Sequence, residues 1–143
     1  MARIRYAGPE AVRDDLVIRY PVLAPRKEEC RAVYGLVRQS FASGGKRLCL
    51  GKGGSAADAL HIVGELRKCF TLPRPIDGAA ARILGARFSQ EGERLAASLE
   101  GALPAVALAE TATLSTALQN EVGGGTPLAQ QVYGLVPPED VML

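Results

Sequence analysis

The residues best suited to chemistry begin with a short glycine-rich loop. Residues 51–55 read Gly-Lys-Gly-Gly-Ser, after a buried strand predicted over 47–50 and before a helix predicted over 55–70. Backbone N–H groups and the positive dipole end at a helix start bind anions, and glycine lets the backbone approach an anion closely. Ser55 could cap the helix and offer its hydroxyl to a phosphate. On its own, the loop is equally well explained as a sharp strand-to-helix turn.

A second set of polar side chains lies further along the same predicted helix. His61 and Glu65 are four residues apart, so they share one helix face, and at about 100° per residue that face also holds Asp58. The opposite face carries the stripe predicted to be buried: Ala59, Ile62, Val63, Leu66 and Phe70. A solvated His–Glu pair is the usual meaning of such spacing. Its position shortly after an anion loop favours a cavity or a neighbouring subunit instead.

Two nucleotide-binding motifs come close to matching the loop. Gly51, Gly53 and Ala56 satisfy the relaxed dinucleotide pattern G-x-G-x-x-G/A. However, no acidic residue at the end of a second strand follows about 20 residues later, where Pro73 and Pro75 stand instead. The P-loop pattern fails because Gly-Lys is never followed by Ser or Thr at the required spacing.

Composition and charge narrow the class of protein. The chain has 143 residues, which fits one domain, and its net charge of +2 comes from 17 basic and 15 acidic residues dispersed along it. That charge is too small to argue for a nucleic-acid partner. The N-terminus does not read as a signal peptide, and no window approaches the ~18 apolar residues of a membrane span. Cys30, Cys49 and Cys69 form no CxxC pair, so we expect reduced thiols in a cytoplasmic protein.

The remaining pattern alternates between helices and strands. Helices are expected over 9–20, 25–42, 77–100, 112–120 and 127–135, and strands over 105–108 and 141–143. The helix over 77–100 is expected in two pieces, with Gly85 and Gly92 as weak points, and residues 123–125 as a glycine turn. Such alternation favours an α/β fold with a parallel sheet covered on both faces.

The run over residues 44–66 resembles a known family. It reads GGKRLCLGKGGSAADALHIVGEL, similar to the stretch of phosphoheptose isomerases, in the sugar isomerase (SIS) family, where a strand precedes GNGGSAADAQHxxxEL. The likeness resumes over 103–108, 119–121, 128–132 and 139–143.

This resemblance implies a doubly wound parallel sheet of SIS type, with flavodoxin-like layers, apparently truncated after the third strand. The whole of 1–143 would be one sugar-phosphate-binding domain. Residues 1–43 would form N-terminal helices and 44–143 the first half of the α/β core, with a helical insertion near 71–102. An unfinished parallel sheet would also leave exposed edges and favour association.

The resemblance further implies an activity and a set of site residues. Phosphoheptose isomerases convert sedoheptulose 7-phosphate into a heptose 7-phosphate, usually as tetramers with active sites at subunit contacts. By position, His61 and Glu65 are implied as catalytic residues and zinc ligands, with Glu65 as the base that moves a proton between C1 and C2. The implied substrate-binding residues are Lys52, Gly53, Gly54, Ser55, Asn120 and Glu121. Zinc is the expected cofactor, and a homo-oligomer, dimer or tetramer, the expected assembly.

Three departures from the family pattern qualify this expectation. Lys52 stands where the family has Asn. Residues 71–102 are longer than their counterpart, so 77–101 could be a flap over the site, an oligomer contact or an ordinary surface excursion. The chain also ends before the family's second phosphate loop and second catalytic histidine. A catalytic zinc takes about three protein ligands, so we expect weak or no isomerase activity unless another chain completes the site.

A non-enzyme alternative stays open. Some SIS relatives are regulatory or scaffold modules that bind a sugar phosphate or a protein partner such as the replication initiator. Those interaction proteins tend to lack a glutamate at the position of Glu65, so its presence favours the enzyme, whereas the early end of the chain favours the module.

Overall fold

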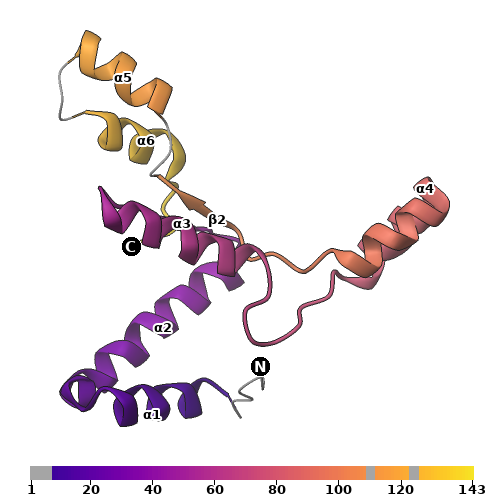
Figure 1. Ribbon diagram of the computed structural model, residues 1–143, viewed down its shortest axis with the longest axis horizontal. Coiled ribbons are helices and arrows are strands. Elements are labelled where there is room, and N and C mark those ends of the chain that lie inside the picture. The colour runs from indigo at the N-terminus through magenta and orange to yellow at the C-terminus, as the bar shows by residue number, and fades with distance from the viewer. Residues whose placement is uncertain (1–7, 109–111, 123–125) are drawn as a thin grey trace.

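The centre of the protein is a parallel three-stranded sheet. The computed structural model describes residues 8–108, 112–122 and 126–143, and its strands β1 (Arg47–Cys49), β2 (Ala105–Ala107) and β3 (Val141–Met142) lie in the order β2-β1-β3. Leu48 of β1 pairs with Val106 on one side and with Met142 on the other. Figure 1 shows the helices extending from this small sheet in different directions. The predicted α/β class with a parallel sheet is confirmed.

The hydrophobic core lies between the sheet and one helix. The helix α3 (Gly54–Arg67) packs against β1 and β2, with Ala59 and Val63 buried against Cys49 and Ala105. Leu48 is fully buried. Small and β-branched side chains allow this close packing, because they occupy little volume on a pleated surface. The core therefore fixes the end of β1 and the start of α3, where the glycine loop joins them.

The predicted stripe of α3 is only partly right. Ala59 and Val63 are buried, but Ile62 is 41% exposed and Phe70 is 79% exposed. The helix was predicted to run to residue 70, yet it ends at Arg67, because Lys68 adopts an extended backbone conformation. Phe70 therefore lies in the following loop rather than on the buried face of α3.

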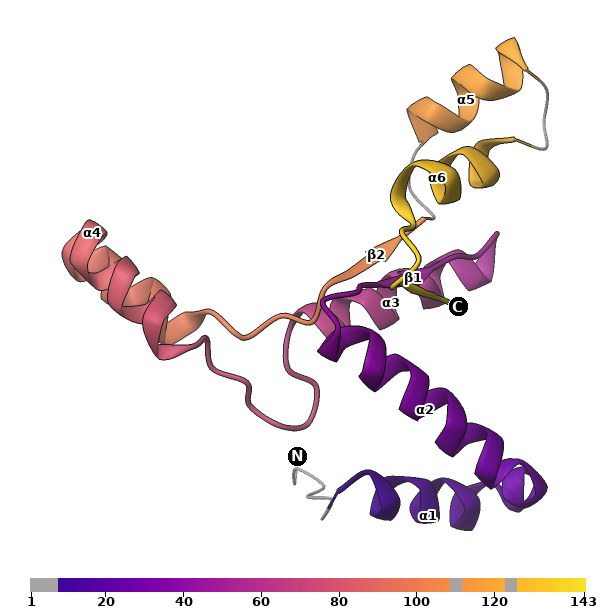
Figure 2. The same ribbon diagram turned by 180° about the vertical axis from the view of Figure 1, so that it is seen from behind.

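The N-terminal helices form an arm beside the sheet, as Figure 2 shows. Helix α1 (Pro9–Arg19) leads through a 3-10 helix, η1 (Pro21–Arg26), into α2 (Lys27–Ala42). The second helix was predicted from residue 25, but Pro25 lies inside η1, and α2 begins two residues later. The Ser40 hydroxyl donates to the carbonyl of Glu139 at 2.7 Å, which ties the end of α2 to the segment before β3.

The insertion predicted near 71–102 contains a helical hairpin, α4 (Gly78–Ser98). Its start is capped by Asp77, whose carboxylate accepts from the backbone N–H groups of Ala79 and Ala80. The expected break into two pieces is confirmed, but it lies at Ser89, with φ 47°, rather than at Gly85 or Gly92. Gly92 serves another purpose: a Cβ there would lie 1.9 Å from the carbonyl oxygen of Leu84, so its lack of a side chain lets the two arms approach closely.

The last two helices connect β2 to β3 along the chain and lie side by side. Helices α5 (Ala112–Glu121) and α6 (Pro127–Leu135) contact each other, close to their predicted bounds of 112–120 and 127–135. The turn predicted at 123–125 lies outside the described residues. Among the helices that the structure describes, none is long and apolar enough to cross a membrane.

Candidate functional site

The glycine loop has the backbone shape that its sequence predicts. Gly53, with φ 57°, precedes the first turn of α3 as its N-cap, a conformation that side-chain-bearing residues rarely adopt. A Cβ on Gly51 would lie 2.4 Å from the backbone carbonyl of Ser55. Both glycines are therefore required by the path of the backbone that leads into α3.

Ser55 holds the loop closed rather than capping the helix. Its Oγ accepts from the backbone N–H of Lys52 at 2.9 Å and donates to the carbonyl of Lys52 at 2.7 Å. The N-cap is Gly53, which has no side chain to bond with, so the predicted capping role of Ser55 is wrong. The hydroxyl instead fixes the position of Lys52, whose side chain is the single charged one among the described residues that line the adjoining cleft.

A cleft opens directly beside this loop. It has a volume of about 280 Å³, and α5 and α6 form its other side. Its lining residues are Gly51, Lys52, Gly53, Ala56, Leu108, Ser115, Gln119, Pro127, Leu128 and Gln131. The structure thus brings the predicted Lys52 and Gly53 together with polar side chains from two further helices.

Asn120 and Glu121 do not belong to this cleft. Both are exposed, and neither lines it, whereas Ser115 and Gln119 on the same helix do. Sequence reasoning missed those two as site residues. A usable signal was present, because Ser115 and Gln119 are four apart on a predicted helix and so share one face. Gln131 lies within the 128–132 stretch of the family resemblance, but that resemblance gave it no site role.

His61 and Glu65 lie in a different cavity, towards the C-terminal end of α3. This cavity has a volume of about 580 Å³. Most of its other lining side chains are apolar, and the remaining lining residues are Ile62, Leu66, Phe70, Thr71, Leu72 and Arg74. His61 and Glu65 therefore share a helix face and a cavity, as their spacing predicts. Asp58, on the same face, is exposed and does not line the cavity.

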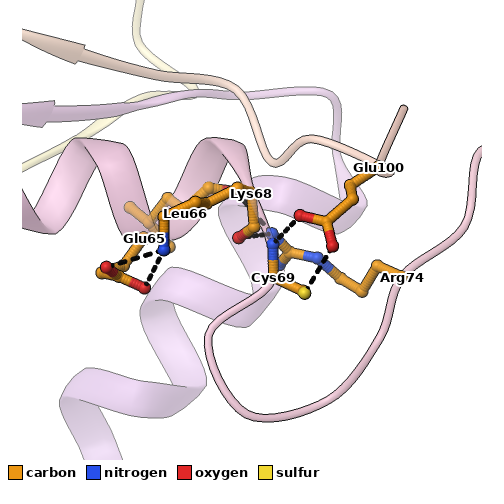
Figure 3. Close-up of polar contacts among 6 residues, drawn as sticks. All are labelled: Glu65, Leu66, Lys68, Cys69, Arg74 and Glu100. Atoms are coloured by element: carbon orange, nitrogen blue, oxygen red, sulfur yellow. Dashed lines mark hydrogen bonds and ion pairs between the residues drawn. The ribbon is translucent and has the colours of Figure 1, made fainter. Parts of the chain in front are cut away.

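The wall of this second cavity is held by a polar cluster that Figure 3 shows in close-up. Arg74 donates from Nη2 to the carbonyls of Leu66 and Lys68, both at 2.7 Å, so it binds the free carbonyls at the end of α3. Glu100 accepts from the backbone N–H of Cys69 at 2.6 Å and also from its thiol. These bonds from Cys69 hold the pKa of Glu100 below its usual range.

Glu65 itself is paired. Lys68 donates from Nζ to both carboxylate oxygens of Glu65 at 2.8 Å, and the Glu65 side chain is 23% exposed. Figure 3 shows the pair on the side of α3 away from Glu100. The lysine thus places its ammonium group directly against the carboxylate that lines the second cavity.

Within one chain, the glycine loop and Glu65 do not share a cavity. Glu65 lies eleven residues beyond Gly54 on α3, which is about 16 Å along the axis at 1.5 Å per residue. Among the described residues, no group of three or more His, Cys, Asp and Glu side chains could hold a metal ion. A catalytic zinc needs about three protein ligands, so the described part of one chain does not fit a complete zinc centre.

Curated phosphoheptose isomerases are similar in sequence to this chain. The phosphoheptose isomerase of Burkholderia pseudomallei (strain K96243) is 35% identical over 104 residues, which are 73% of this chain and 40% of the relative. That of Aquifex aeolicus (strain VF5) is 34% identical over 111 residues, 78% of this chain and 44% of the relative. The chain is phosphoheptose isomerase-like. This agrees with the SIS-family resemblance of residues 44–66, although no protein-family model matches the chain.

A solved structure supports the phosphoheptose isomerase-like fold. The phosphoheptose isomerase of Neisseria gonorrhoeae superposes with a TM-score of 0.50 at 23% identity, over 92% of this chain and 58% of that one. At this identity the likeness establishes the α/β fold with N-terminal helices. The chain spans about 40% of the length of the first curated relatives, so the activity of the whole relative comes to this chain only as a proposal.

Proposed function

We propose that this chain provides the substrate-binding part of a sugar-phosphate isomerase, acting on sedoheptulose 7-phosphate to give a heptose 7-phosphate. The observation that carries the proposal is the open cleft at the start of α3, where the backbone of Gly51 and Gly53 and the charge of Lys52 converge. A phosphate fits this place, because backbone N–H groups, the helix dipole and an ammonium group all favour an anion.

Glu65 is the proposed base. Aldose–ketose isomerisation moves a proton between C1 and C2, which needs a carboxylate within hydrogen-bond reach of both carbons' protons. Glu65 is paired with Lys68 and lines a cavity with room for a small substrate. His61 lies one turn earlier on the same face and would orient a substrate hydroxyl or take part in binding a metal.

A second copy of the chain is proposed to complete the active site. The cleft at the loop and the cavity at Glu65 are separate in one chain, and the second cavity has an exposed apolar wall that includes Phe70 at 79% and Leu72 at 63% exposure. Apolar side chains exposed to this degree beside a cavity are typical of surfaces that a partner covers. A homo-oligomer could place the loop of one chain near Glu65 of another, and zinc would need ligands from both.

The test is calorimetric titration with sedoheptulose 7-phosphate, with and without zinc, together with an isomerase assay. The wild-type chain and Glu65→Gln should both bind, because the phosphate lies at the loop. Turnover should fall by about 10²- to 10⁴-fold in the variant, the usual contribution of general acid–base catalysis. Glu93→Gln, which changes an exposed carboxylate on α4, is the matched control and should keep full turnover.

Two outcomes would redirect the proposal. The absence of sugar-phosphate binding by the wild type would discard a sugar-phosphate site altogether. Binding by the wild type and by Glu65→Gln without turnover in either would favour the second candidate, a non-catalytic SIS module. The separation of the two cavities within one chain is the observation that keeps this candidate in place.

A further inference from the structure

Helix α5 presents two polar side chains to the cleft across from the glycine loop. Ser115 and Gln119 both line it, and their spacing of four residues puts them on one face of the helix. Leu108, Pro127 and Leu128 supply its apolar surface. The polar groups of the cleft are therefore divided between a cationic, N–H-rich side at the loop and a neutral side at α5 and α6.

Gln131 adds a buried amide on the neutral side. Its residue is only 4% exposed, and its Nε2 donates to the carbonyl of Pro127, one turn earlier in α6, at 3.2 Å. Among the described residues, none donates a hydrogen bond to its Oε1. This amide borders the cleft, so its Oε1 can accept a hydrogen bond from a ligand hydroxyl there.

The chemistry of the two sides differs in a way that indicates the ligand. A phosphate accepts hydrogen bonds and attracts positive charge, which the loop and Lys52 supply. The Ser115 hydroxyl and the amides of Gln119 and Gln131 can each donate and accept hydrogen bonds. Sugar hydroxyls, which also donate and accept, require such partners. The volume of about 280 Å³ lies just below the ~300–1,000 Å³ of drug-sized ligand pockets, so the cleft fits a small ligand.

We propose that Ser115, Gln119 and Gln131 bind the hydroxyl groups of a phosphorylated sugar whose phosphate lies on the 51–55 loop, and that they set the specificity of the site. This inference rests on the proposed function and deepens it. It assigns the sugar-contacting role to Ser115 and Gln119 instead of to Asn120 and Glu121, the residues that the family resemblance implies.

The experiment is calorimetric titration of the full chain with two probes, sedoheptulose 7-phosphate and inorganic phosphate. Gln119→Leu and Ser115→Ala should each weaken binding of the sugar phosphate about 3- to 10-fold, the usual effect of losing one neutral hydrogen bond. Neither should change binding of inorganic phosphate. Thr116→Ala removes an exposed hydroxyl of α5 that donates to the carbonyl of Thr113, and it should change neither affinity.

Gln131 needs a variant that keeps its volume. Methionine is close in shape to glutamine but has no amide, so Gln131→Met should weaken binding of the sugar phosphate and leave binding of inorganic phosphate unchanged. Circular dichroism will show whether the variant folds. If the variant does not fold, Gln119→Leu and Ser115→Ala still decide the question, because both side chains lie at the surface of α5.

Each remaining outcome overturns something definite. If the wild type binds the sugar phosphate and the Gln119 and Ser115 variants bind it equally well, this inference is wrong and the proposed function stands. The same holds if Asn120→Ala, rather than Gln119→Leu, loses affinity. If Gln119→Leu loses affinity for both probes equally, the residue supports the loop and does not contact the sugar. If the wild type binds neither probe, the proposed function fails as well.

Discussion

The two cavities beside α3 are built by opposite means. The cleft at the N-terminal end is shaped by backbone: Gly51 and Gly53 take paths that a side chain would block or strain, and the Ser55 hydroxyl holds the loop closed. The cavity at the C-terminal end is shaped by long side chains, with Arg74 fixing its wall. A backbone site holds its shape through steric constraint, whereas a side-chain wall holds it through individual hydrogen bonds.

Substitution of Gly51 should give the largest effect on the first cavity. Gly51→Ala forces a Cβ to within 2.4 Å of the Ser55 carbonyl, and overpacking of this kind costs about 1–3 kcal/mol or more. We expect a lower melting temperature and loss of sugar-phosphate binding. Gly64→Ala, in α3 with no atom near its added Cβ, should raise stability by up to about 1 kcal/mol.

The second cavity can be followed separately during that experiment. His61 is the single histidine of the chain, so its imidazole NMR signals report on that cavity alone. They should stay unchanged in Gly51→Ala if the two cavities are independent. A large shift would show that the loop and the cavity at Glu65 move together, and the contrast between them would be lost.

Gly92→Ala should lower stability by a similar amount, but only within the hairpin α4. Its Cβ would lie 1.9 Å from the Leu84 carbonyl oxygen, so the two arms of α4 must separate, at about 1–3 kcal/mol. Gly85→Ala meets only the side chain of Glu93 at 3.8 Å and is the matched control. Hydrogen exchange should accelerate over 78–98 in Gly92→Ala alone, while the glycine loop keeps its protection.

Loss of Arg74 should affect the second cavity and spare the first. Arg74→Ala removes hydrogen bonds to two carbonyls at the end of α3, and we expect a loss of about 1.5 kcal/mol, the lower end for bonds to a charged group. The His61 signals should shift, and phosphate binding at the loop should remain. Arg82→Ala, at an exposed position on α4, is the control and should neither lower stability nor shift the His61 signals. Equal effects from both substitutions would contradict the assigned role of Arg74.

The smallest expected effect concerns pH. Burial raises the pKa of Asp140, but the bonds from Lys46, at 2.6 Å to Nζ and 2.8 Å to the backbone N–H, outweigh it and lower the pKa overall. A lowered folded-state pKa contributes stability that is present above the unfolded value of about 3.9 and is lost as pH falls through the folded pKa. Asp140→Asn should therefore flatten the loss of stability below about pH 4 in denaturant titrations; an unchanged pH dependence would contradict the role of the Lys46–Asp140 pair.

Much of the fold could be predicted from the sequence, because its signals are local. The proline at the start of α6 and the apolar run of β1 place those elements within a residue of their observed bounds. The end of α3 could not be predicted, since Arg74, further along the chain, binds the carbonyls that would otherwise continue the helix. The bend at Ser89 was missed because glycine is the expected residue at a positive φ.

The candidate site was predictable in its parts but not in its grouping. The loop and the His61–Glu65 pair each carry a recognisable local pattern, and both face cavities. Their separation along α3, and the entry of Ser115 and Gln119 in place of Asn120 and Glu121, depend on how α5 lies against the loop. A one-dimensional pattern does not contain that rotation of one helix against a distant segment.

The base of the hairpin has a practical consequence. Gly101 donates its backbone N–H to the carbonyl of Arg74 at 2.5 Å, and Pro75 pairs with Glu100, so the chain leaves the body and returns to it at adjacent points. In both overall views the hairpin extends away from the sheet. Residues 76–99 can thus be exchanged for a short turn, or for an unrelated helical pair carrying a fluorophore or an affinity tag, without lengthening any connection in the α/β core.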